Sequence, residues 1–182
     1  MMGWGMVAKA QTPVLNEMMS SNQLAHFDDF FESDDWVEIY NPGGLLDLAG
    51  HHISDDPSNL TKYTFPDSDP GSTFMTPGDH LLVWCDNDSV QGVLHANFKL
   101  SAENEGVWLT APDGVTVLDS IVYPPQQTDV SFGRACDGCE EWVYFNVPTP
   151  ESANVDEVLP TPALYLNEVL LDNSNVLIDE NA

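Results

Sequence analysis

The chain has 182 residues, of which 42% are hydrophobic and 10% aromatic. This composition is that of a folded globular protein and excludes a disordered chain. Thirty acidic residues stand against four basic ones, giving a formal net charge of −26. Nucleic acids and anionic membranes attract Lys and Arg, so we expect neither as a partner. The charge favours cations, basic partners, or simple solubility in a salty environment.

The chain begins with small and apolar residues, MMGWGMVAKA, that look like the end of an export signal. Ala8-Lys9-Ala10 fits the small-x-small rule of signal peptidase, so we expect residues 1–10 to be a truncated signal peptide. An expression scar is the alternative. The chain has no run of about 18 apolar residues, and the sequence therefore predicts no membrane insertion.

Strand patterns dominate the next 130 or so positions. In WVEIYN, Trp36, Glu38 and Tyr40 alternate with Val37 and Ile39, which is typical of a half-buried strand. Eight to ten short strands at about ten-residue spacing, without a helical period, indicate an all-β sandwich or barrel. The expected strand stretches, with their turns, are 36–41, 45–54, 60–65, 77–85, 92–100, 105–114, 115–125, 130–135 and 140–147.

The strand pattern then gives way to proline, small polar and acidic residues, and we place a linker at 156–163. After it, Leu166-Asn167-Glu168 repeats Leu15-Asn16-Glu17, and both are followed by apolar residues, an Asn and an acid. Residues 164–182 are therefore interpreted as the first strand of a truncated second copy. A strand without its own sheet seeks an open edge, so segment 164–171 is a candidate for strand-mediated self-association.

Two of the three cysteines form the motif ACDGCEEW, which holds Cys136 and Cys139. Such a pair can be a redox centre, half of a zinc site, or a small disulfide. We favour the disulfide, because Asp137-Gly138 is typical of a hairpin turn and no further zinc ligands lie at a familiar spacing. Cys85 is expected to be a buried, unpaired thiol.

A run of acidic residues precedes the strand at 36–41, and calcium is the ion that it suits best. Ca²⁺ takes six to eight oxygens from carboxylates and carbonyls on flexible loops, but no EF-hand motif is present. A purely solvated acidic surface is the alternative, and further acidic loops lie at 67–69 and 86–88. No cofactor is required; the tentative calcium ligands are Asp28, Asp29, Glu32, Asp34 and Asp35.

The sequence predicts no enzyme. The motifs GxSxG and HExxH and a glycine-rich phosphate loop are absent. His51 and His52 are adjacent in a strand pattern and therefore point to opposite faces. His80 and His95 lie in strand patterns, where they are expected to pack or donate hydrogen bonds.

The ordered motifs DDWVEIYNPG, LDLAGHHISDD, PGDHLLVWCDND, LHANFKLSAENEGVWL and DGVTVLDSIVYPPQQTDVSFGR resemble those of lamin tail domains in secreted bacterial proteins. The resemblance covers about residues 13–155, and we expect the domain at 11–155. It implies an immunoglobulin-like β-sandwich in an exported, extracellular or cell-surface protein. Its role would be a non-catalytic module that spaces or docks other domains or surface partners. A calcium-dependent module for glycan or cell-surface binding, built on exposed tryptophans, is the alternative.

The chain has one arginine, Arg134, in the motif SFGR. We expect it to form a bidentate bond with a carboxylate that fixes a strand, rather than to recognise a substrate.

Overall fold

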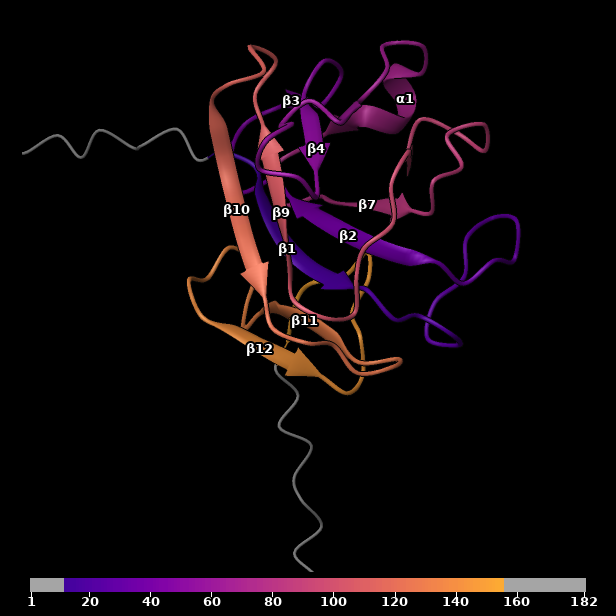
Figure 1. Ribbon diagram of the computed structural model, residues 1–182. Coiled ribbons are helices and arrows are strands. Elements are labelled where there is room, and N and C mark those ends of the chain that lie inside the picture. Colours follow the sequence, from indigo (N-terminus) through magenta and orange to yellow (C-terminus); the bar gives the residue numbers. More distant parts are fainter. Residues whose placement is uncertain (1–11, 156–182) are drawn as a thin grey trace, which may run out of the picture.

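The computed structural model describes residues 12–155 (Figure 1). The expected signal remnant at 1–10, the linker at 156–163 and the second copy with its edge-seeking segment 164–171 lie outside the described residues, so these assignments stay predictions. Within the described part the protein is a β-sandwich, and the predicted immunoglobulin-like all-β fold is confirmed. Its one helix, α1 (Pro70–Thr73), is a single turn.

The larger sheet has six strands in the order β12-β11-β1-β2-β7-β8. All neighbours are antiparallel except β7 and β8, which are parallel. In Figure 1 its last two strands, β11 and β12, lie together at the bottom of the view. The bounds are β1 (Val14–Met19), β2 (Asp35–Tyr40), β7 (His80–Cys85), β8 (His95–Ala96), β11 (Ser131–Arg134) and β12 (Trp142–Phe145).

The second sheet has the order β10-β9-β4-β5, and β3 pairs with β6 in a separate ribbon. The turn of the β9–β10 hairpin forms as predicted, with Gly114 at φ +72° and the Asp113 carboxylate accepting the backbone N–H groups of Val115 and Thr116. The bounds are β3 (Leu46–Asp47), β4 (His52–Ser54), β5 (Tyr63–Thr64), β6 (Phe74–Met75), β9 (Glu105–Thr110) and β10 (Val117–Tyr123).

Three of the expected strand stretches are much shorter than predicted, and one of them, 60–65, contributes only the two residues of β5. The stretch 45–54 is divided between β3 and β4, which belong to different sheets. The break lies at Gly50, whose φ of +80° is not a strand conformation. The stretch 92–100 contributes only β8, because the parallel pairing with β7 covers two residues.

The main core lies between the two sheets. Val37, Ile39 and Val83 project into it from the larger sheet, and Ile53 and Leu109 from the smaller one. These five side chains are at most 1% exposed. The predicted thiol Cys85 is also in this core, fully buried and unpaired, and burial raises its pKa well above the ordinary value.

The opposite face of the six-stranded sheet is buried as well. Strand register places Met19, Trp36, Trp84 and His95 in one row across β1, β2, β7 and β8. Trp36 is 0% exposed, as is Glu38 on the same face. The prediction of a half-buried β2 was therefore wrong. Alternate side chains of β2 do point to opposite faces, but both faces are buried, because the cleft loops and the segment 149–154 cover the outer one.

The segment 149–154, which follows β12, is held on this outer face by buried polar groups. Glu17 accepts hydrogen bonds from the Thr149 backbone and hydroxyl groups. Asn154 donates to the carbonyls of Asn16 and Arg134 at 3.0 and 2.8 Å. Gly133 allows this approach, since a Cβ there would lie 2.9 Å from Glu17 Cγ. The segment is thus part of the sandwich and not a loose tail.

Arg134 fixes the strands as predicted, but not through a bidentate bond. Its Nη2 donates to Asp119 at 2.8 Å, Nε donates to the Leu15 carbonyl at 2.7 Å, and Nη1 donates to the Cys139 carbonyl. One guanidinium therefore connects β10, β1 and the disulfide turn.

Replacing Arg134 with Met should destabilise the domain by about 3 kcal/mol, because it leaves a largely buried Asp119 without its cation. Urea unfolding followed by tryptophan fluorescence measures the loss. The matched control is Lys99→Met, which removes the more exposed pair with Asp34 and should cost about 1 kcal/mol or less. Equal losses in the two variants would contradict the structural role of Arg134.

No helix in the described residues is long and apolar enough to cross a membrane.

Candidate functional site

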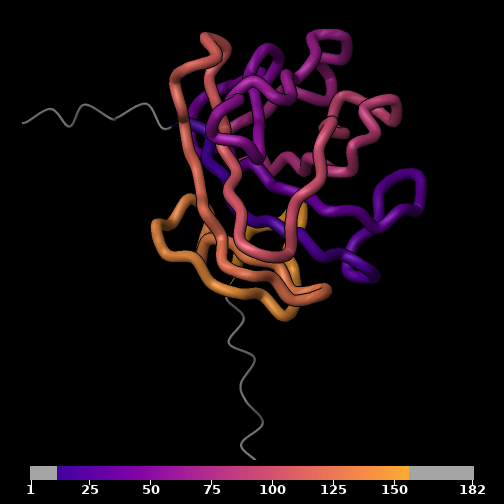
Figure 2. Tube along the Cα trace, in the orientation of Figure 1, coloured from indigo at the N-terminus to yellow at the C-terminus, as the bar shows by residue number. Residues whose placement is uncertain are grey.

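A cleft of about 310 Å³ opens on the outer face of the six-stranded sheet. Its floor is formed by β7 and β8, with Leu82 and Trp84 on one strand and His95 on the other. One wall is the loop between β1 and β2, which projects from the domain in Figure 2. The other walls come from the loop 91–94, from Asp69 and Ser72 at α1, and from Glu151.

A tight turn shapes the first wall. Asp28 Oδ1 accepts the backbone N–H groups of Phe30 and Glu32, each at 2.8 Å. The Asp28 N–H in turn donates to the Glu32 carbonyl at 3.0 Å, and Phe31 takes a φ of +64°. These bonds close the loop on itself, so that its aromatic side chains project outward. The acidic run is therefore a turn built around one of its own carboxylates.

The loop carries an aromatic rim, which we define as Phe27, Phe30 and Phe31. These side chains are 46%, 52% and 87% exposed. Phe27 and Phe30 line the cleft. On the facing loop Val90 is 92% exposed, and its neighbour Gln91 donates to Glu32 at 2.6 Å, which ties the two loops together. Large apolar groups gathered at the mouth of a cleft are typical of a binding surface.

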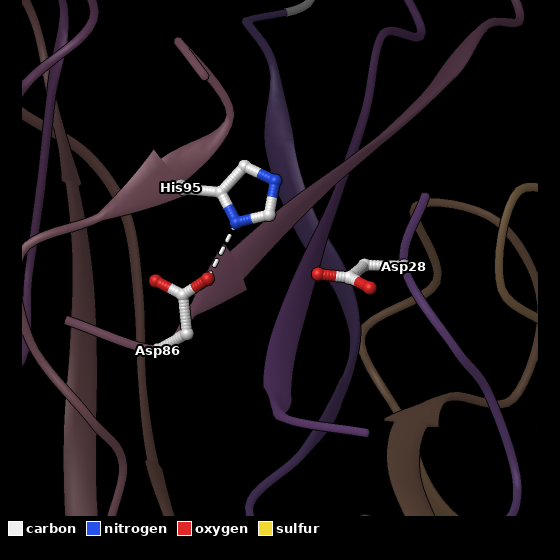
Figure 3. A group of neighbouring side chains, drawn as sticks. All are labelled: Asp28, Asp86 and His95. Atoms are coloured by element: carbon white, nitrogen blue, oxygen red, sulfur yellow. Dashed lines mark hydrogen bonds and ion pairs between the residues drawn. The ribbon is translucent and has the colours of Figure 1, made fainter. Parts of the chain in front are cut away.

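An acid–histidine cluster lies at the edge of the cleft, formed by Asp28, Asp86 and His95 (Figure 3). His95 Nδ1 is 2.5 Å from Asp86 Oδ2, and the carboxylate of Asp28 faces this pair. One potential ligand atom from each residue lies within 4.8 Å of the others. Three segments supply the cluster: the β1–β2 loop, the residue after β7, and β8.

The five acids proposed for calcium do not converge. Only Asp28 points into the acid–histidine cluster. Asp29 is exposed, Glu32 pairs with Gln91, and Asp34 contacts Lys99 at 3.0 Å. Asp35 begins β2 and accepts the Leu100 N–H, and burial raises its pKa to about 6. The calcium site stays a prediction, but these five side chains do not gather around one point.

Sequence reasoning noted Asp86 only as part of an acidic loop and expected His95 to pack or donate a hydrogen bond. The two residues meet because β8 pairs in parallel with β7, with Trp84 opposite His95 and Cys85 opposite Ala96. Two residues that are nine positions apart and meet through parallel strand pairing leave no recognisable pattern in the local sequence. The one available signal was a histidine and an aspartate flanking a turn-rich segment.

The disulfide, the histidines of β4 and β7 and the tryptophans lie away from the acid–histidine cluster or beneath the cleft. A disulfide joins Cys136 and Cys139 across the turn at Gly138, whose φ is +67°. His52 is buried and hydrogen-bonded to Thr64, and His80 Nε2 lies 3.1 Å from Asp137. Among the tryptophans in residues 12–155 none is exposed, so the aromatic platform of the glycan-binding alternative is not found there.

The fold and the cleft define a class of protein: an immunoglobulin-like sandwich whose loops enclose a cleft. Residues 7–125, more than half of the chain, match the Lamin Tail Domain family, and the chain belongs to that family. It is a family of non-enzymatic interaction modules. Comparison with curated proteins and with solved structures gave no match.

Proposed function

We propose that this chain is an interaction module of an exported bacterial multidomain protein, and that it docks a basic polypeptide segment in the cleft. The partner segment would place one or two apolar side chains against the aromatic rim. The exposed rim at the mouth of a preformed cleft is the observation that carries this proposal.

The charge of the protein supports a basic partner. The cleft is lined by Asp29, Asp69 and Glu151 in addition to its aromatic groups, and the whole chain carries a formal charge of −26. Lys or Arg residues flanking an apolar anchor would meet these carboxylates, which accelerates association and selects against acidic partners. Export and neighbouring domains are part of this proposal, and the resemblance to lamin tail domains of secreted bacterial proteins supports them.

Selection of peptides from a random displayed library would test the docking site. We expect enriched sequences to combine aromatic or aliphatic anchors with Lys or Arg. Their affinity should fall about tenfold or more in the double variant Phe27→Ser/Phe31→Ser, because rim anchors contribute most of the binding free energy.

The control is Val115→Ser/Val122→Ser, which removes two other exposed apolar side chains, 73% and 63% exposed, near and on β10. Peptides that bind both double variants equally well, or enrichment of acidic peptides, would refute docking at the aromatic rim.

A further inference from the structure

We infer that Asp28, Asp86 and His95 form a binding site for a Zn²⁺-type divalent cation. The three side chains come from separate segments and bring one potential ligand atom each to within 4.8 Å of one another. The inference does not depend on the docking of a polypeptide.

The environment of Asp28 leaves one buried carboxylate oxygen available to a cation. The residue is 8% exposed, and its Oδ1 is used by two backbone N–H groups of its own loop. Its Oδ2 is buried and has no hydrogen-bond partner. A buried carboxylate oxygen without a partner is costly, and the carboxylate faces the Asp86–His95 pair in Figure 3.

The charge of the cluster also calls for a cation. Asp86 is 8% exposed and lies close to the equally buried Asp28, so two carboxylates share one buried site. No Lys or Arg side chain of residues 12–155 forms an ion pair with either of them. Each of the three is engaged by another carboxylate, in the pairs Lys62–Asp55, Lys99–Asp34 and Arg134–Asp119. A divalent cation would balance both negative charges.

The donor set selects the class of metal. Ca²⁺ and Mg²⁺ prefer oxygen ligands throughout, whereas one imidazole nitrogen with two carboxylate oxygens suits Zn²⁺ and similar transition metals. Zn²⁺ bonds of about 2.0–2.2 Å would place the donor atoms about 3.3 Å apart. The Asp86–His95 contact therefore has to open and Asp28 has to move inward, which its position in a loop allows.

Other groups around the cluster would support the ligands. Asp86 Oδ1 accepts the Asp88 N–H at 2.8 Å, which fixes the carboxylate with Oδ2 toward His95. The ring of Phe30 meets that of His95 edge-on, with centroids 6.1 Å apart, and limits the access of water from that side. Such partners orient metal ligands and raise affinity.

Calorimetric titration of the chelator-treated, desalted chain with ZnCl₂, in buffer containing excess MgCl₂, tests the inference. The Mg²⁺ occupies loose acidic sites on the surface. We expect one Zn²⁺ per chain, unchanged in Asp29→Asn and at least about tenfold weaker in Asp28→Asn. These variants remove the same charge from adjacent positions, one exposed and one in the cluster. Equal Zn²⁺ affinity in both variants, or no Zn²⁺ binding by the wild-type chain, would overturn the site.

Cobalt spectroscopy of the wild-type chain gives a second measurement that needs no variant to fold. Co²⁺ bound by one nitrogen and two oxygens of a low-coordinate site should absorb strongly in the visible range, and one equivalent of Zn²⁺ should remove the band. A spectrum like that of aqueous Co²⁺, or a band removed equally well by Ca²⁺, would overturn the site.

Discussion

A chain that ends at residue 125, where the family match ends, should lose cooperative folding. The missing β11 lies inside the six-stranded sheet, between β12 and β1, so its removal exposes the whole edge of β1. The truncation also removes Arg134, Ser131 and Thr149, which leaves the buried carboxylates of Asp119 and Glu17 without these partners. The combined loss exceeds the roughly 5–15 kcal/mol that stabilises an ordinary domain.

Circular dichroism during urea unfolding distinguishes the two outcomes. The control is a chain that ends at residue 155, which retains β11, β12 and the Asn154 hydrogen bonds and should unfold in one cooperative transition. A cooperative transition of the shorter chain at a similar urea concentration would show that the C-terminal strands are an addition to the fold and not part of its core.

The protein should be more stable at pH 5 than at pH 8, because carboxylates of β1 and β2 are buried. Burial raises the pKa of Glu38 from its ordinary 4.5 to about 8, with the charges of Glu17 and Asp137 acting in the same direction. Burial also raises the pKa of Glu17, and that of Asp35 to about 6. The folded state therefore holds protons that the unfolded state releases.

The direction in which stability changes with pH follows from this difference in bound protons. For Glu38 the stabilisation is complete below about pH 4.5 and is lost as the pH rises through about 8. At about 1.4 kcal/mol for each pH unit, the free energy of unfolding falls by up to about 4 kcal/mol between pH 5 and pH 8. Repulsion within a chain of formal charge −26 acts in the same direction.

Exposed carboxylates in turns set the low-pH limit of the range in which the protein is most stable. Hydrogen bonds from Thr116 lower the pKa of Asp113 from 3.8 to about 2. Its contribution is present above about pH 3.8 and is lost as the pH falls through about 2. Maximum stability is therefore expected near pH 4 to 5, below the range of about 5 to 8 that is usual for proteins.

Urea unfolding at half-unit intervals from pH 4 to pH 9 measures the dependence. The variant Glu38→Gln should have a flatter slope between pH 5 and pH 8, and Glu103→Gln, at an exposed position, should keep the wild-type slope. Stability that rises toward pH 8, or equal slopes in the two variants, would contradict the assignment to Glu38.

Local sequence signals predicted the parts of the fold that depend on short-range chemistry. The β9–β10 hairpin follows from Pro112-Asp113-Gly114, because only a few turn conformations fit these residues. The small disulfide follows from Asp137-Gly138 in the same way. β2 and β7 follow from their β-branched and aromatic residues.

Features that depend on residues distant in the chain were not predicted correctly from the sequence. Residues 45–54 have one apolar pattern but supply strands to two sheets. β3 pairs with β6 and β4 pairs with β9, and both partners are distant in the chain. Trp36 and Glu38 have the alternation of a solvent-facing strand, yet both are buried because segment 149–154 and the cleft loops lie over them.

The sequence by itself determined the family, the all-β class and the acidic character of this protein, since these depend on composition and ordered motifs. Only the tertiary structure decided which carboxylates meet. Of five acids in the run from residue 28 to residue 35, three contact other partners, Asp29 is exposed, and Asp28 alone meets Asp86 and His95. The reason is physical: a side chain's neighbours in space are set by strand register and loop closure, which local sequence does not encode.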